Sequence, residues 1–168
     1  MHSLHKIGMR LITTSMLVVI IAACSKPDST PSNSPTRINE LASAYFEVYR
    51  QRTDFEQFMS FYATNAIFED IVQNKRFDGK PAIRAFLNWQ QGEFSVIGGS
   101  TEQASPPILS VHKQVVQGQT AITQGVFHAF TYNGKTMGPW MFVIVQEFNA
   151  QGKIMKQSDW INYKQEVM

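Results

Sequence analysis

The sequence predicts an α+β domain in which helices come first and an antiparallel sheet follows. Apolar residues recur at helical spacing between Ile38 and Tyr49, whereas β-rich runs occupy most of the chain after residue 107. Two of these runs are joined by Asn133-Gly134, one of the strongest short signals for a β-hairpin. Helical segments followed by a meander of strands indicate helices packed on one face of a sheet.

Two further helices are expected after the first. The stretch Thr53-Asp54-Phe55-Glu56 has the form of a capping box, and it starts an apolar helical face that runs to Tyr62. Thr64-Asn65 ends this helix, and Ala66–Val72 is typical of a strand. A turn at Asp78-Gly79 then precedes a third helix with Pro81 in its first turn. Four β-rich runs complete the domain: Ile108–Val116, Thr120–Tyr132, Thr136–Phe148 and Lys153–Tyr163.

The N-terminal region has the layout of a secretory signal. Lys6 and Arg10 precede Leu11–Ala23, which is mostly apolar but shorter than the roughly 20 residues that a membrane-spanning helix needs. The chain's only cysteine follows, and Ile21-Ala22-Ala23-Cys24 resembles the bacterial lipoprotein box. That resemblance implies that Cys24 is acylated and becomes the first residue of the mature chain. A buried core cysteine behind an ordinary signal peptide is the alternative.

Three segments are therefore expected: a signal peptide over 1–23, a lipidated cysteine with a disordered tether over 24–37, and a folded domain over 38–168. The tether is rich in Pro, Ser, Thr and Asn and offers little to bury. The lipid would hold the protein at the bacterial cell envelope. Because Ser25 rather than Asp follows the cysteine, the usual sorting pattern predicts the outer membrane where the source has one.

Charge and composition exclude several functions. The chain has 15 Lys and Arg against 13 Asp and Glu, and loss of Lys6 and Arg10 with the signal would leave 13 of each. No basic stripe remains, which argues against a nucleic-acid partner. The sequence has no Gly-rich phosphate loop and no His-Glu-x-x-His motif, and only His112 and His128 follow the signal. We therefore expect neither a cofactor nor a bound metal.

Four short motifs carry a family resemblance: Ala66–Asp70 (AIFED), Phe77–Lys80 (FDGK), Ala82–Phe86 (AIRAF) and Gly152–Ile154 (GKI). Their order and spacing resemble the nuclear-transport-factor-two-like superfamily, which includes SnoaL-like polyketide cyclases and ketosteroid isomerases. The resemblance implies a conical fold in which a strongly curved antiparallel sheet wraps helices around one deep pocket. Enzymes, binding proteins and oligomerisation modules share this fold, so it does not settle function.

The comparison with ketosteroid isomerases suggests site residues. It places Asp70 at the position of the general base, Tyr45 near an oxyanion-hole tyrosine and Tyr62 near a supporting tyrosine. Ile144 and Leu87 stand where the isomerases have a second oxyanion donor and another pocket tyrosine. Loss of one oxyanion donor typically costs about two to three powers of ten in rate. Steroid isomerisation in its usual form is therefore not expected.

Strand parity decides which other side chains face the pocket. By the same comparison the inward residues of the last two strands are Trp140, Phe142, Ile144, Gln157, Asp159, Ile161 and Tyr163. The inward histidine depends on register. A bulge at Gly138-Pro139, which we favour because it brings the more apolar faces together, would turn Ile122, Gln124, Val126 and His128 inward. Without the bulge, His112 would be the inward histidine.

Two classes of function remain after these steps. The favoured one is a domain that binds a small, mostly apolar molecule, with Tyr45, Tyr62, Trp140, Phe142 and Tyr163 as ligand contacts. The other is an enzyme of isomerase, cyclase, dehydratase or epoxide-hydrolase type, in which Asp70 is the base and His128 or Asp159 its complement. A partner-binding or oligomerisation module of the envelope, including a homodimer, also remains open. The tyrosines and Trp140 could equally be core residues.

We expect the Cys24→Ser variant to leave the membrane fraction or to accumulate as an unprocessed precursor, because it lacks the thiol that would be acylated. Fractionation of cells and mass spectrometry of the mature N-terminus check this. Mature, membrane-free protein with an unmodified Cys24 would contradict the lipoprotein assignment.

Overall fold

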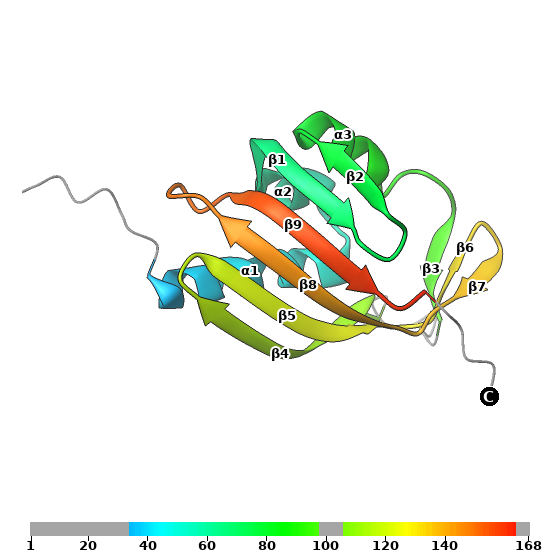
Figure 1. Cartoon of the computed structure of the whole chain (residues 1–168). Helices are drawn as coiled ribbons and strands as arrows, with labels where there is room; N and C mark the ends of the chain where they lie inside the picture. The colour runs from blue at the N-terminus through cyan, green and yellow to red at the C-terminus, as the bar shows by residue number, and fades with distance from the viewer. Residues whose placement is uncertain (1–33, 98–105, 164–168) are drawn as a thin grey trace, which may run out of the picture.

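The computed structural model describes residues 34–97 and 106–163, so Cys24 and most of the expected tether lie outside the described residues. Three helices lie against one face of a twisted sheet, and three short strands lie at one end of it (Figure 1). In chain order the elements are α1 (Pro35–Gln51), α2 (Phe55–Ser60), β1 (Tyr62–Asp70), β2 (Lys75–Asp78), α3 (Lys80–Phe86), β3 (Phe94–Val96), β4 (Leu109–Gln117), β5 (Thr120–Phe127), β6 (Phe130–Tyr132), β7 (Lys135–Met137), β8 (Trp140–Phe148) and β9 (Ile154–Ile161). The predicted α+β class with helices packed on a curved sheet is confirmed.

Helix α1 begins slightly before the expected start of the domain. Ser34 is its N-cap, with the Ser34 side chain accepting a hydrogen bond from the Arg37 backbone N–H at 3.2 Å. Pro35 fits the first turn because no backbone donor is needed there. The helix buries Ile38 and Tyr45 against the sheet, as its spacing predicts.

Helix α2 is shorter than expected. Its N-cap is Asp54, whose carboxylate accepts from the Gln57 backbone N–H at 2.8 Å, so the cap lies one residue after the predicted Thr53. The helix ends at Ser60, and Tyr62 is the first residue of β1 rather than part of the helical face. The expectation of a helix through Tyr62 was wrong because helical and strand spacing both bring Tyr62 to the buried side of the chain.

The main sheet has six strands in the order β2-β1-β9-β8-β5-β4. Neighbours are antiparallel except for β1 and β9, which run parallel. The sheet is therefore mixed, not purely antiparallel as expected. The parallel register places Asp70 directly opposite Asp159. A second, three-stranded sheet, β3-β6-β7, forms beside the end of β5.

The predicted bulge at Gly138-Pro139 is absent from the pairing of β5 with β8. Phe127 pairs with Trp140, and farther out Phe130 pairs with Met137, so no residue is inserted between the two strands. Consequently Ile122 faces outward with 44% of its surface exposed, and Gly125 lies on the inner face. The inner face needs Gly125 because a Cβ there would lie 2.5 Å from the Phe142 ring. The register of β5 against β8 is therefore set by the lack of space for a side chain beside Phe142, and not by which faces of the two strands are more apolar.

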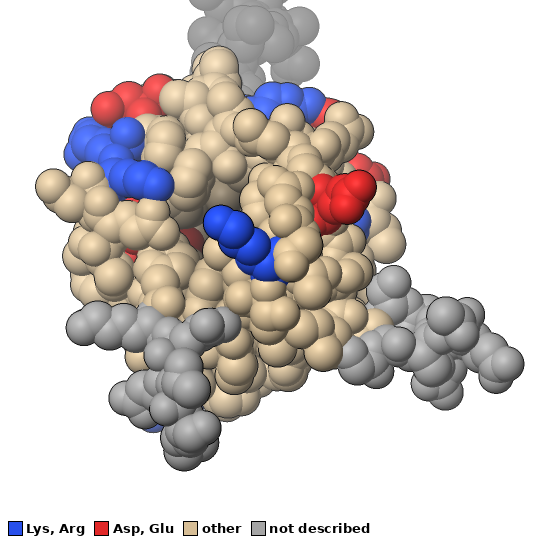
Figure 2. Space-filling model, turned by 90° about the vertical axis from the view of Figure 1, so that its right-hand side faces the viewer, with Lys and Arg blue, Asp and Glu red and all other residues tan. Residues whose placement is uncertain are grey.

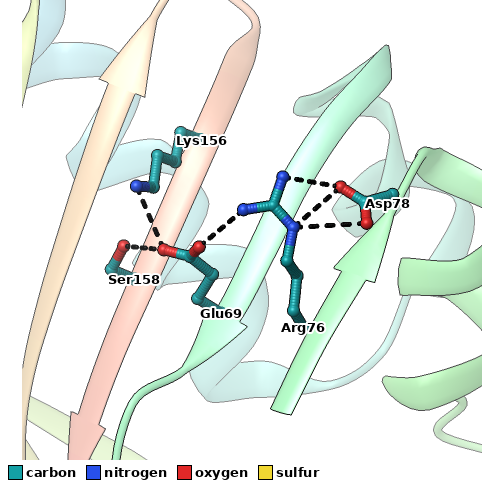
Figure 3. A network of polar contacts seen from close by, with 5 residues as sticks. All are labelled: Glu69, Arg76, Asp78, Lys156 and Ser158. Carbon is teal, nitrogen blue, oxygen red and sulfur yellow. Dashed lines mark hydrogen bonds and ion pairs between the residues drawn. The ribbon is translucent and has the colours of Figure 1, made fainter. Parts of the chain in front are cut away.

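The outer face of the sheet divides into a polar and an apolar part. Across β2, β1 and β9, Glu69 contacts Arg76 at 2.8 Å and Lys156 at 3.0 Å (Figure 3). Arg76 also contacts Asp78, and Ser158 donates to Glu69. Exposed ion pairs of this kind contribute little stability. Large apolar side chains are exposed on β5, β8 and β9, namely Ile122, Met141, Val143 and Trp160.

Within residues 34–97 and 106–163, the helices are all too short or too polar to cross a membrane.

We expect Gly125→Ala to destabilise the domain by about 1–3 kcal/mol, the usual cost of overpacking. Its Cβ would lie 2.2 Å from the Ser110 carbonyl oxygen as well as against Phe142. The matched control is Gln124→Ala, the next residue along β5, which faces outward and should change the free energy of unfolding little. Urea unfolding of both variants checks this, and equal stabilities would contradict the inward placement of Gly125.

Candidate functional site

A cavity of about 150 Å³ lies between the inner face of the sheet and the ends of α1 and α3. Its walls are mainly aromatic and aliphatic, and Figure 2 shows a hollow in the face at the end where the short strands lie, with recessed acidic surface beside it. Four lining residues carry polar or charged groups: Tyr49, Arg52, Asp159 and Tyr163. The apolar lining residues are Phe68, Phe86, Leu87, Ile108, Phe127, Phe130, Trp140 and Ile161.

Two buried carboxyl groups stand side by side behind this cavity. Asp70 and Asp159 are only 1% and 4% exposed, and the parallel pairing of β1 with β9 sets them opposite each other. The Asp70 carboxylate accepts from the Tyr163 hydroxyl at 2.5 Å and from the Gln73 backbone N–H at 2.9 Å. Asp159 lines the cavity directly, whereas Asp70 is linked to it through the Tyr163 side chain.

A chain of buried hydrogen bonds supports Asp159 from the core. The Gln157 amide donates to the Asp159 carboxyl at 2.9 Å, and the Gln157 oxygen accepts from the Tyr62 hydroxyl at 2.9 Å and from the Gln146 amide at 3.1 Å. The Tyr45 and Tyr62 hydroxyls are bonded to each other at 3.0 Å. Burial raises the pKa of both tyrosines well above its ordinary range, so both hydroxyls stay protonated.

Asp159 is the carboxyl whose proton affinity is most changed by its surroundings. Burial raises the pKa of Asp159 from 3.8 to about 8, the hydrogen bond from Gln157 works against this shift, and the neighbouring Asp70 adds to it. Asp159 is therefore mostly protonated at neutral pH. A neutral carboxyl can donate a hydrogen bond to a ligand in the cavity, which an ionised one cannot do.

The structure brings three of the sequence-predicted site residues to the cavity wall: Trp140, Asp159 and Tyr163. Tyr45 and Tyr62 lie in the core behind Asp159 and make no part of the lining. Phe142 faces inward as expected but packs in the core, where its ring stacks on Phe46 at 5.8 Å between centroids. Ile144 is fully buried, and Leu87 lines the cavity.

Neither histidine faces the cavity. The His128 ring is hydrogen-bonded to the Ser110 hydroxyl at 2.9 Å, one residue beyond the inward Phe127. His112 is exposed, at an irregularity in the pairing of β4 with β5 between Val111 and Lys113. Both predicted orientations were wrong, the first because the bulge is absent and the second because β4 has a bulge of its own. Over residues 34–97 and 106–163, no group of three or more His, Cys, Asp or Glu side chains could hold a metal.

Two of the polar lining residues, Tyr49 and Arg52, were not predicted from the sequence to lie at the pocket. Tyr49 belongs to the helical face that the spacing predicts, so its burial was foreseen but its place beside a cavity was not. Arg52 is the C-cap of α1 and has a left-handed backbone conformation, with φ of 49°. No sequence signal indicates that an arginine will adopt this conformation, which favours glycine and asparagine.

The comparisons with known proteins give a fold and no closer relative. No family model matches the chain. No curated protein matches it either. Among solved structures, a candidate ketosteroid isomerase from Kribbella flavida is similar with a TM-score of 0.56 and 17% identity, over 82% of this chain and 85% of that one.

Two further structures have the same fold. A candidate SnoaL-like polyketide cyclase from Shewanella putrefaciens has a TM-score of 0.58 and 19% identity, over 76% of this chain and 90% of that one. An LEH-like epoxide hydrolase from M. tuberculosis has a TM-score of 0.58 and 16% identity, over 76% and 84%. These similarities confirm the expected α+β fold with helices packed on a curved sheet. At such identities they show the fold alone, and the fold is shared by different functions.

We expect stability to fall as pH rises from about 4 to 8, because the folded state keeps a proton on Asp159 that the unfolded chain has released. The contribution of this one group is about 1 kcal/mol per pH unit inside that window. Asp159→Asn is neutral at every pH, so its free energy of unfolding should depend less steeply on pH than that of the wild type.

Urea unfolding at several pH values between these limits measures the two slopes. The control is Asp78→Asn, an exposed carboxylate paired with Arg76, which should leave the slope over this pH range unchanged. Equal slopes for wild type and Asp159→Asn would contradict the raised pKa.

Proposed function

We propose that the domain binds a small, mostly apolar molecule in the cavity beside Asp159. The size of the cavity supports this, because an engineered protein cavity of about 150 Å³ with apolar walls binds benzene. The wall composition also supports it, since ligand sites are mostly hydrophobic and aromatic with a few placed polar groups. The cavity has that composition, with Asp159 and Tyr163 among its polar groups.

The observation that carries the proposal is the unpaired indole N–H of Trp140. Its side chain lines the cavity, and its indole N–H is buried without a hydrogen-bond partner among the described residues. A buried donor left unpaired costs free energy, about 1–3 kcal/mol. A ligand with an apolar body would remove this cost where its acceptor group reaches the indole N–H.

A titration with neutral one-ring compounds, toluene and benzamide, followed by NMR, tests the proposal. We expect both compounds to shift the resonances of the Trp140 indole and the Ile161 methyl groups, since both side chains line the cavity. The Val115 methyl groups, which are exposed on β4, serve as the internal control. Shifts of similar size at Val115, or none at Trp140, would contradict binding in the cavity.

A second candidate function is general acid–base catalysis on such a ligand. It is favoured by the two carboxyl groups, because their environments differ: Asp159 holds its proton to about pH 8, and Asp70 accepts hydrogen bonds from Tyr163 and Gln73. In this scheme Asp159 is the acid at the cavity wall. Asp70 is the base and acts through the hydroxyl of Tyr163. His128 has no part in the scheme, since it does not line the cavity.

We expect Asp70→Asn to abolish any turnover while leaving the fold and most of the ligand affinity unchanged. The amide nearly keeps the shape and can still accept from Tyr163, but it cannot take up a proton. Wild type, Asp70→Asn and the surface control Asp78→Asn would be assayed in parallel on epoxide, enone and β-hydroxy-ketone test substrates. Equal turnover by wild type and Asp70→Asn would exclude Asp70 as the base, and no turnover by any of them would leave binding as the function.

We also propose that the domain is held at the bacterial cell envelope by lipid on Cys24. The Ile21-Ala22-Ala23-Cys24 box and the basic and apolar segments before it support this. The folded domain starts at Pro35, so the proline- and serine-rich segment that follows Cys24 would serve as its tether. In a Gram-negative source, Ser25 favours the outer membrane.

A further inference from the structure

Arg52 is a cation at the cavity wall that the proposed binding mode leaves unused. It ends α1, where its backbone N–H donates to the Val48 carbonyl at 3.1 Å. Its guanidinium lies over two aromatic rings, with Cζ 4.0 Å from the centroid of Phe94 and 5.2 Å from that of Trp89. One of its N–H groups makes a long hydrogen bond of 3.5 Å to the Trp89 carbonyl.

Three other arginines of the domain have carboxylate partners. Arg50 pairs with Glu47, Arg76 with Glu69 and Asp78, and Arg84 with Glu56. Arg52 has no ion pair with a carboxylate of residues 34–97 or 106–163. Burial lowers the pKa of Arg52, which shows that its surroundings disfavour the charge. A half-buried charge without a counter-ion costs free energy, so the site lacks a partner of opposite charge.

The contacts of Arg52 with described residues are two cation–π contacts and one hydrogen bond. Cation–π contacts form through the face of the guanidinium, whereas its five N–H donors point outward in the plane. The Trp89 carbonyl takes one donor. The remaining donors have the fork geometry that binds a carboxylate through two parallel hydrogen bonds.

Neither carboxyl group of the site is paired with Arg52. Asp70 is bonded to Tyr163 and Gln73, and Asp159 is bonded to Gln157 and is mostly neutral at pH 7. On the face shown in Figure 2, basic side-chain surface lies next to the hollow. An anionic group placed near Arg52 would meet its positive charge, and Asp159, the carboxyl that lines the cavity, opposes it little while it is protonated.

We propose that Arg52 binds the anionic end of the ligand, and that the ligand class is small organic carboxylates with one ring or a short apolar chain. The proposal rests on the binding function proposed above and adds the charge of the ligand. The carboxylate would lie on the edge of the Arg52 guanidinium, and the apolar body would lie against Phe127, Phe130 and Trp140, which line the same cavity.

The test compares benzoate with benzamide, which have nearly the same shape but differ in charge at neutral pH. Dissociation constants for the full chain come from NMR titration, with the Trp140 indole as reporter. We expect benzoate to bind at least about tenfold more tightly than benzamide, the scale of a charge-assisted hydrogen bond. Arg52→Gln should remove this preference, so that benzoate and benzamide bind with similar affinity.

Two further variants make the test specific. Arg84→Gln changes the net charge equally but removes an exposed arginine paired with Glu56, so it should keep the preference for benzoate. Arg52→Lys keeps a cation without the planar fork and should keep a weaker preference. If Arg52→Gln does not fold, the wild-type ratio and the Arg52→Lys ratio decide the matter.

The outcomes separate the two proposals. Equal affinities of the wild type for benzoate and benzamide, or an unchanged ratio in Arg52→Gln, would overturn the role of Arg52 and leave the cavity as a binding site for neutral molecules. Failure of both compounds and of toluene to perturb Trp140 would overturn the binding function itself, and with it the role of Arg52.

Discussion

The burial of two carboxyl groups side by side is the constraint on which the rest of the structure depends. Asp70 and Asp159 lie opposite each other on parallel strands and are almost completely buried. Two adjacent buried carboxylates cannot both ionise without a large cost, so one must keep its proton. The structure resolves this by giving Asp70 donors in Tyr163 and Gln73, and by leaving Asp159 protonated.

A chain of hydrogen-bonded side chains in the surrounding core supports Asp159. Gln157 joins Asp159 to Tyr62, and Tyr62 joins Tyr45 on the first helix, so a polar chain crosses an otherwise apolar core. Buried networks of this kind specify a structure when each member is satisfied. On the other side of Asp159 the apolar walls form the cavity, where the unpaired Trp140 donor and the uncompensated charge of Arg52 lie. Among the described residues the Gln146 side-chain oxygen is left unpaired in the core network, and the Trp140 indole N–H is left unpaired in a residue of the cavity wall.

The sequence allowed the order of the three helices and of the longer strands to be predicted, together with the inner faces of the last two strands, because these follow from hydrophobic spacing, turn residues and family resemblance. The inward placement of Asp159 and Trp140 followed from the same parity, and that of Asp70 followed from the family resemblance. The orientation of His128 could not be predicted in this way. It depends on the register of β5 against β8, in which Gly125 lies opposite Phe142 because a larger residue would not fit there. That requirement can be recognised only once the pairing of the two strands is known.

Two other features of the site had no usable local signal. Tyr62 satisfies helical and strand spacing equally well, and its true position depends on where α2 ends. Arg52 reaches the cavity through a left-handed cap that its residue type does not favour. Both are cases in which tertiary packing overrides local preference.

The most direct test of this account is the ionisation of Asp159 itself, followed by the carboxyl ¹³C resonance across a pH titration and assigned by its loss in Asp159→Asn. The account requires a midpoint near pH 8, with the resonance of the protonated form at neutral pH. A midpoint near 4, the ordinary range for an aspartate, would contradict it. Asp159 would then be a charged group at the cavity wall, and neither the donor role of Asp159 nor the preference for an anionic ligand would follow.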